Sequence, residues 1–217
     1  MRDARPTVTG RPDDTGEGRT GRPDAGPGPD AARSAAPAPP WALAERRVLR
    51  ALRGCGRRPP VAALARGLSS GGEHGALWLA AGLTAAALDP PRRAGWLRGT
   101  ALIGAAHLAS MGVKRLVRRP RPDPETYRPL VRTAGRHSFP SSHATSAAAA
   151  AVAFGVLRPP AGRIAAPLAT AMCVSRLVVG VHYPTDVAAG ALLGAATAAA
   201  GRRLLVPATR ARGEVRP

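Results

Sequence analysis

Aromatic residues and cysteines are scarce in this chain of 217 residues, and each shortage argues against a class of function. Aromatic residues make up 3% of the sequence, although the net charge is +19. Proteins that bind nucleic acid more often stack bases on aromatic side chains or present a continuous basic helix, so a nucleic-acid partner is not expected. Cys55 and Cys173 lie far apart, and neither has a partner at metal-ligand spacing, so no zinc site or disulfide framework is indicated.

The two ends of the chain are poor in large apolar residues. Residues 1–40 are rich in Pro, Gly, Asp and Arg, a composition that cannot bury enough surface to offset chain entropy, so we predict a disordered tail. Residues 207–217 form a short basic tail. Residues 41–70 alternate arginine with Leu, Val and Ala, which predicts amphipathic helix too charged to span a bilayer. We interpret this segment as interfacial; a helix pair packed on a soluble domain is the alternative.

Five apolar segments follow within residues 71–206, and each is expected to be helical. Several are shorter than the ~20 residues that a spanning helix needs, so flanking residues or tilt would supply the difference. Their Ala and Gly content suits close helix packing in lipid, and the near absence of internal charge favours a membrane over a soluble bundle. We therefore predict an all-α integral-membrane bundle of about five transmembrane helices in a bacterial plasma membrane. The segments are 75–88, 99–113, 143–157, 164–181 and 185–201.

A histidine and an aspartate, His182 and Asp186, lie four residues apart, with Arg176 six residues ahead of the histidine. If the intervening segment is helical, the imidazole and the carboxylate share one face. Charged groups in a membrane-like segment mark a functional site. A carboxylate that accepts from one imidazole nitrogen leaves the other nitrogen basic, as in an oriented base or nucleophile. A buried pair that only ties two helices together is the alternative.

Two further motifs precede this one: Lys114-x6-Arg121-Pro122 and Pro140-Ser141-Ser142-His143. Together with Ser-Arg-x5-His-x3-Asp, they resemble the type 2 phosphatidic acid phosphatase (PAP2) family, which shares its fold with vanadium-dependent haloperoxidases. The resemblance covers roughly residues 75–205. Its one departure is Ser142, where the family most often has glycine, and this departure bears on the fine geometry of the site.

The resemblance implies a phosphatase that needs no metal or other cofactor and acts through a phosphohistidine. His182 would attack phosphorus, and Asp186 would orient it. His143 would protonate the leaving group and later activate water. The phosphoryl oxygens would be held at cationic side chains and at the start of a helix, by Lys114, Arg121, Arg176, Ser141 and Ser142.

Lys114 is the only lysine among the 32 lysines and arginines. A single lysine at a motif position indicates a site that requires a compact ammonium group rather than a planar guanidinium. We expect the neighbouring arginines to form a solvated or headgroup-facing cluster: Arg115, Arg118 and Arg119. The other histidines match no motif position and are expected to be structural or substrate-facing: His74, His107 and His137.

The motifs define the reaction type and leave the lipid open. The Glu73-His74 pair and residues 138–146 also resemble an actinobacterial subgroup that includes the phosphatase proposed for decaprenylphosphoryl-5-phosphoribose. We therefore expect a polyprenyl-linked cell-envelope precursor as substrate. Alternative substrates are undecaprenyl diphosphate, phosphatidate and phosphatidylglycerophosphate. Alternative functions are a catalytically silent lipid-binding membrane protein and a soluble vanadate-dependent oxidant. If five segments cross the membrane, all three motifs lie on the same side of it as the N-terminus. The distribution of Lys and Arg predicts that this side is the cytoplasmic one.

Overall fold

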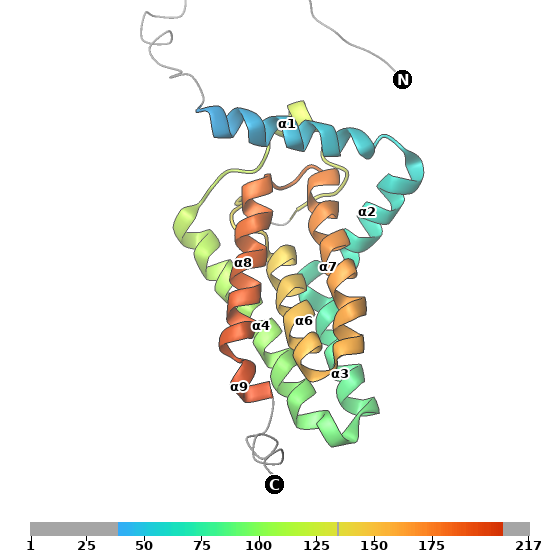
Figure 1. Ribbon diagram of the computed structural model, residues 1–217. Helices are drawn as coiled ribbons and strands as arrows, with labels where there is room; N and C mark the ends of the chain where they lie inside the picture. Colours follow the sequence, from blue (N-terminus) through green and yellow to red (C-terminus); the bar gives the residue numbers. More distant parts are fainter. Residues whose placement is uncertain (1–38, 134, 206–217) are drawn as a thin grey trace, which may run out of the picture. The chain divides into compact units, whose positions relative to one another are not determined.

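The computed structural model describes residues 39–133 and 135–205 (Figure 1). The tail predicted for residues 1–40 lies outside this part of the chain except for its last two residues, as does the whole tail of residues 207–217. The regular elements of the described part are helices, which confirms the all-α prediction.

The helices begin where the sequence supplies a start signal. Five of them, α1, α2, α5, α7 and α8, carry proline in their first turn, where the missing N–H costs no intrahelical hydrogen bond. The α-helices are α1 Pro40–Cys55, α2 Pro59–Gly71, α3 Ala76–Leu88, α4 Arg93–Val117, α5 Pro124–Tyr127, α6 Ser142–Leu157, α7 Pro159–Val178, α8 Pro184–Ala200 and α9 Arg202–Leu205. Two short 3-10 helices, Glu73–Gly75 and Pro90–Arg92, precede α3 and α4.

The five expected apolar segments correspond to α3, α4, α6, α7 and α8, which form an elongated bundle (Figure 1). Helix α6 lies at its centre and packs against α4, α7 and α8. Helix α1 lies across one end of the bundle, and α2 leads back from it towards the bundle. No helix in the described ranges is both long enough and apolar enough to count as a membrane span, so the number of crossings stays a prediction.

The core of the bundle is built largely from alanine. Helix α6 contributes Ala147, Ala150 and Ala153, all fully buried, and small side chains let the surrounding helices approach closely. Trp96 and Phe154 add two large side chains to this core, with ring centroids 5.4 Å apart in an edge-to-face arrangement.

Two glycines of α8 set the distance between α8 and α6. Gly190 and Gly194 are four residues apart and therefore share one helix face. A Cβ atom at Gly190 would stand 2.4 Å from the backbone oxygen of Ser141, and one at Gly194 would stand 2.0 Å from that of Thr145. The two backbones are thus in direct contact, and this contact brings the first turn of α8 against the start of α6.

Candidate active site

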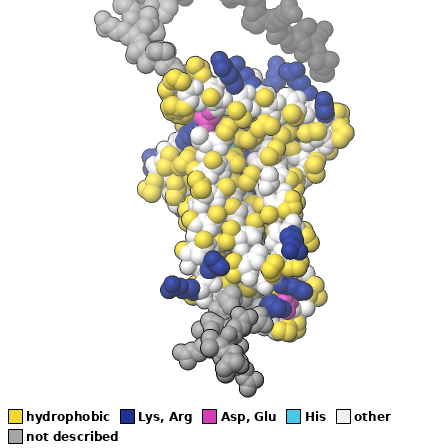
Figure 2. Space-filling view, viewed as in Figure 1, with side chains coloured by type: hydrophobic (Ala, Val, Ile, Leu, Met, Phe, Trp, Pro, Cys, Tyr) yellow, Lys and Arg dark blue, Asp and Glu magenta, His cyan; other side chains and the backbone are white. Residues whose placement is uncertain are grey.

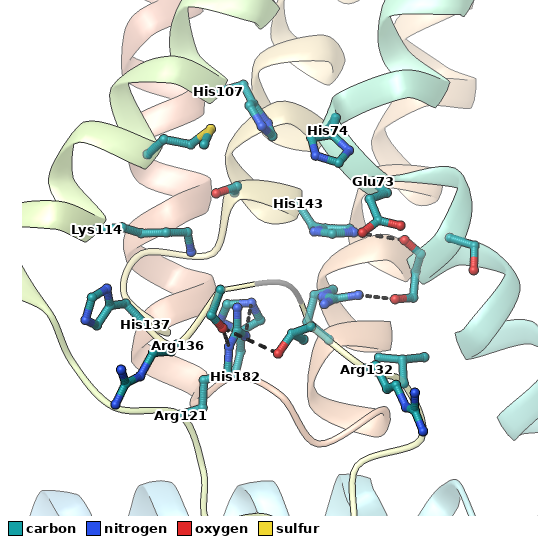
Figure 3. A pocket seen from close by; sticks show the side chains of 18 of the residues that line it. Glu73, His74, His107, Lys114, Arg121, Arg132, Arg136, His137, His143 and His182 are labelled. Carbon is teal, nitrogen blue, oxygen red and sulfur yellow. Dashed lines mark hydrogen bonds between the residues drawn. The ribbon is translucent and has the colours of Figure 1, made fainter.

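A cavity of about 320 Å³ opens between α2, α4, α6, α7 and the loop that joins α4 to α6 (Figure 3). Residues from all three motifs line it: Lys114, Arg121, Ser142, His143, Arg176 and His182. The chain contains five histidines, and the three without a motif position also line this cavity: His74, His107 and His137. Whether these three histidines are structural or face the substrate stays a prediction.

His182 lines the cavity, and Asp186 lies beside it, outside the lining. His182 occupies the turn before α8 and Asp186 the first turn of that helix, so the pair forms without His182 being helical. Their Nδ1 and Oδ2 atoms are 3.6 Å apart, and both residues are buried. Among the described residues Nδ1 has no hydrogen-bond partner, so a small movement of the ring would complete a bond to the carboxylate.

The other nitrogen of His182, Nε2, lies 3.4 Å from Nη1 of Arg121. Burial, followed by the nearby guanidinium groups of Arg176 and Arg121, lowers the pKa of His182 well below its usual value. Both effects favour the neutral imidazole, whose Nε2 carries a lone pair that is directed towards Arg121. This is the protonation state that a nucleophile requires.

Backbone carbonyls hold two of the cationic side chains in place. The ammonium of Lys114, in the last turn of α4, donates to the carbonyl oxygens of Pro140 and, at 3.4 Å, of Ser138. The guanidinium of Arg121 donates to those of Gly135 at 2.8 Å and Val181 at 2.9 Å. Because both cations are oriented by neutral groups, their charge remains available to an anion in the cavity.

Ser69, near the end of α2, connects His143 and Arg176. Its carbonyl oxygen accepts from Nε2 of His143 at 2.9 Å, which places a proton on that nitrogen because a carbonyl can only accept. Its hydroxyl accepts from Nη1 of Arg176, whose side chain is buried. Sequence analysis missed Ser69, since α2 lies outside the three motifs and a lone serine at a helix end carries no signal.

The two serines of the second motif have different surroundings. Ser142 lines the cavity, and its hydroxyl accepts from Ser110 at 2.9 Å. Ser141 caps α6 through its side chain, and its backbone N–H donates to the carbonyl oxygen of Asp186 at 2.9 Å. That N–H is occupied, and Ser141 is not among the lining residues. In this arrangement Ser141 joins α6 to α8, and the phosphate-binding role expected for it stays a prediction.

Arg119 also departs from expectation, because it is half-buried rather than solvated. One nitrogen, Nη1, donates to Oδ1 of Asp186 at 2.8 Å, and the other, Nη2, donates to Oε2 of Glu45 at 2.7 Å. The guanidinium carbon lies 4.2 Å from the centre of the Tyr183 ring. The available signal was Glu45, which is the one acidic residue among residues 41–70 and is buried in a cationic helix. Arg115 and Arg118 are exposed, but Arg115 also lines the cavity.

Comparison with known proteins places these residues in a family context. Residues 95–210, which include every predicted site residue, match the PAP2 superfamily. Decaprenylphosphoryl-5-phosphoribose phosphatase of Mycobacterium tuberculosis is 45% identical over 142 residues, which are 65% of this chain and 79% of that protein. The protein of the same name from Mycolicibacterium smegmatis is 46% identical over 137 residues, or 61% and 73% of the two chains.

A solved structure with a similar fold is that of the first transmembrane PAP2 type phosphatidylglycerolphosphate phosphatase from Bacillus subtilis. The TM-score is 0.66 with 24% sequence identity, and the match covers 86% of this chain and 92% of that chain. At this identity the likeness concerns the fold alone.

Proposed function

Since this chain belongs to the PAP2 superfamily and is a phosphatase of that type, we propose that it removes the terminal phosphate of a polyprenyl-linked phosphosugar through a phosphohistidine. The proposed substrate is decaprenylphosphoryl-5-phosphoribose or a close analogue. The observation that carries the proposal is the position of His182, backed by Asp186, in a cavity whose lining includes Lys114, Arg121 and Arg176.

In the first step, Nε2 of His182 attacks phosphorus while the bond from phosphorus to the leaving oxygen breaks. Nδ1 needs a proton for the phosphohistidine to form with Nε2 as nucleophile, and Asp186 accepts a hydrogen bond from it. Lys114, Arg121 and Arg176 stabilise the charge on the phosphoryl oxygens, which increases in the transition state.

His143 supplies the proton that the leaving alcohol requires. The general acid is His143 as an imidazolium: Nε2 keeps its hydrogen on the Ser69 carbonyl, and Nδ1 gives its proton to the leaving oxygen. After the alcohol departs, the neutral Nδ1 takes a proton from water, which attacks phosphorus and breaks the bond to His182. Inorganic phosphate leaves, and both histidines return to their starting states.

The substrate class comes from the relatives and is compatible with the cavity. Two related proteins are named decaprenylphosphoryl-5-phosphoribose phosphatase, and this chain matches 79% and 73% of their lengths. Besides the residues proposed to hold the phosphate, the lining includes polar side chains that can form hydrogen bonds with sugar hydroxyls, among them Ser70, Glu73 and His74.

We further propose that the bundle is embedded in the bacterial plasma membrane, with α3, α4, α6, α7 and α8 crossing it. Hydrophobic side chains cover most of the visible face between its ends, and Lys and Arg gather mainly towards those ends (Figure 2). Large aliphatic side chains on the bundle helices are more than half exposed: Leu83, Leu88, Leu108, Ile164 and Leu192. Lipid would cover this surface.

The test is phosphate release by detergent-purified protein in the presence of EDTA. The panel holds decaprenylphosphoryl-5-phosphoribose, undecaprenyl diphosphate, phosphatidate and phosphatidylglycerophosphate, each run beside His182→Ala. We expect the phosphoribosyl lipid to be preferred, EDTA to have no effect and the variant to be inactive. Preference for another lipid would overturn the substrate assignment, and an active His182→Ala protein would overturn the mechanism.

A second arm separates the two histidines. With p-nitrophenyl phosphate, whose leaving group needs no proton, His143→Ala should still form the phosphoenzyme but hydrolyse it slowly. Protein quenched in base should then retain base-stable, acid-labile phosphate in His143→Ala and none in His182→Ala. The reverse pattern would exchange the two roles.

A further inference from the structure

Arg119 forms a bridge between α1 and the aspartate behind the nucleophile. Its two terminal nitrogens contact Asp186 at 2.8 Å and Glu45 at 2.7 Å. Both carboxylates are almost completely buried. A buried carboxylate without a partner is strongly disfavoured, so this single guanidinium accounts for the burial of two negative charges.

The bridge determines which oxygen of Asp186 faces the histidine. Oδ1 accepts from Arg119, whereas Oδ2 accepts from the backbone N–H of Tyr183 at 2.8 Å and lies 3.6 Å from Nδ1 of His182. With both oxygens held, the carboxylate cannot rotate away from the imidazole.

Glu45 also holds the first turn of α8 directly. Its Oε1 atom accepts from the backbone N–H of Thr185 at 3.0 Å and from the hydroxyl of the same residue. A carboxylate at this position satisfies a free N–H and interacts favourably with the helix dipole. Helix α1 is therefore attached to the turn that carries His182 and Asp186.

We infer that Glu45 and Arg119 are positioning residues for the nucleophile: the docking of α1 through Glu45 holds Arg119 against Asp186 and thereby fixes the His182 imidazole. This inference rests on the proposed phosphohistidine mechanism. Neither Glu45 nor Arg119 is among the residues that line the cavity, so their replacement should alter the chemical step and leave substrate affinity unchanged.

A double-mutant cycle tests the inference. Arg119→Gln and Glu45→Gln are each made in the wild-type chain and in Asp186→Asn, and kcat and KM are measured with p-nitrophenyl phosphate. In the wild-type background we expect kcat to fall at least tenfold, with KM and the inhibition constant for inorganic phosphate within twofold. In Asp186→Asn the further loss should be less than twofold, because both residues act through that carboxylate.

The matched controls are Arg118→Gln, an exposed arginine beside Arg119, and Arg47→Gln, an exposed arginine of α1. Both should leave kcat unchanged. Equal losses in the two backgrounds, or a rise in KM, would overturn the inference and leave a general structural role. Arg119→Lys keeps a cation but cannot contact Asp186 and Glu45 as completely, so its kcat should be intermediate. This variant also serves as the test if Arg119→Gln does not fold.

A readout without turnover separates this inference from the mechanism on which it rests. In protein labelled with ¹⁵N-histidine, the resonances of His182 are assigned by their loss in His182→Ala. They should shift in Arg119→Gln and Glu45→Gln but not in Arg118→Gln. An unchanged His182 spectrum would refute the positioning role even for a protein that hydrolyses no substrate in the panel. If the His182 resonances shift in Arg119→Gln and Glu45→Gln but His182→Ala is active, the positioning role stands and the phosphohistidine mechanism is refuted.

Discussion

Lys114 offers a direct test of how closely the phosphate site is fitted to its cation. Its ammonium has three N–H bonds, and two are directed at the carbonyl oxygens of Pro140 and Ser138. One donor therefore remains for a phosphoryl oxygen. A guanidinium at this position would be longer and planar, and its fork could not satisfy both carbonyls and the phosphate from the same place.

The loss in the variants can be estimated from the contacts. Lys114→Arg keeps the charge but misplaces one hydrogen bond to a charged group, which is worth about 1.5–3 kcal/mol. This corresponds to a decrease in kcat/KM of roughly 10- to 150-fold. Lys114→Gln also removes the charge that stabilises the transition state, and losses of about 10²–10³ in kcat are typical for such donors. The expected order of activity is wild type, then Lys114→Arg, then Lys114→Gln.

The assay is kcat/KM for phosphate release from the preferred lipid in detergent, with folding of each variant followed by thermal unfolding. Arg118→Lys, the reverse exchange at an exposed position four residues away, serves as the control and should match the wild type. Wild-type activity in Lys114→Arg would refute the reasoning, because it would mean that charge alone matters. A Lys114→Arg protein less active than Lys114→Gln would point to steric exclusion instead.

Two further predictions concern pH and packing. Because burial and neighbouring arginines lower the pKa of His182, the neutral nucleophile persists on acidification, and the acid limb of kcat/KM should lie below the ordinary histidine value of about 6.5. A limb at or above that value would contradict the assignment, and Arg121→Gln should move it upward. Gly194→Ala would place a methyl group 2.0 Å from the Thr145 carbonyl oxygen and should cost at least about 1–3 kcal/mol in unfolding free energy. Gly104→Ala, with no atom within 4 Å, should be neutral or stabilising in the same measurement.

The helices of the bundle could be predicted because their signals are local. Alanine-rich runs bounded by proline and glycine specify where α6, α7 and α8 begin and end. Proline stands in the first turn of α7 and α8, and the Ser141 side chain caps α6. The site residues were predictable for a different reason. Their motifs fix residue type and spacing, and six of the eight residues line one cavity, with Asp186 directly behind it.

The supporting contacts were not predictable, because they join residues far apart in sequence. Arg119 and Glu45 are separated by 74 positions, and so are His143 and Ser69. Arg119 resembles its exposed neighbours Arg115 and Arg118 in every local respect. Only the folded position of α1 and α2 at the end of the bundle distinguishes it from them.

The distribution of charge around the site favours a dianionic ligand. The cations of the three motifs that line the cavity are held by neutral oxygens: Lys114 and Arg121 by backbone carbonyls, and Arg176 by the Ser69 hydroxyl. The carboxylates of Asp186 and Glu45 lie behind the nucleophile instead, where they are paired with Arg119.

This separation has a consequence for substrate choice. Since six cationic side chains line the cavity and Glu73 is the one carboxylate among the lining residues, the desolvation cost of these cations is offset most fully by a ligand with two negative charges and several acceptor oxygens. A phosphomonoester carries up to two charges on three free oxygens, whereas a phosphodiester carries one charge on two. In a lipid that contains both groups, the terminal monoester should therefore occupy the position beside His182, and the diester that bears the polyprenyl chain should lie towards the mouth of the cavity.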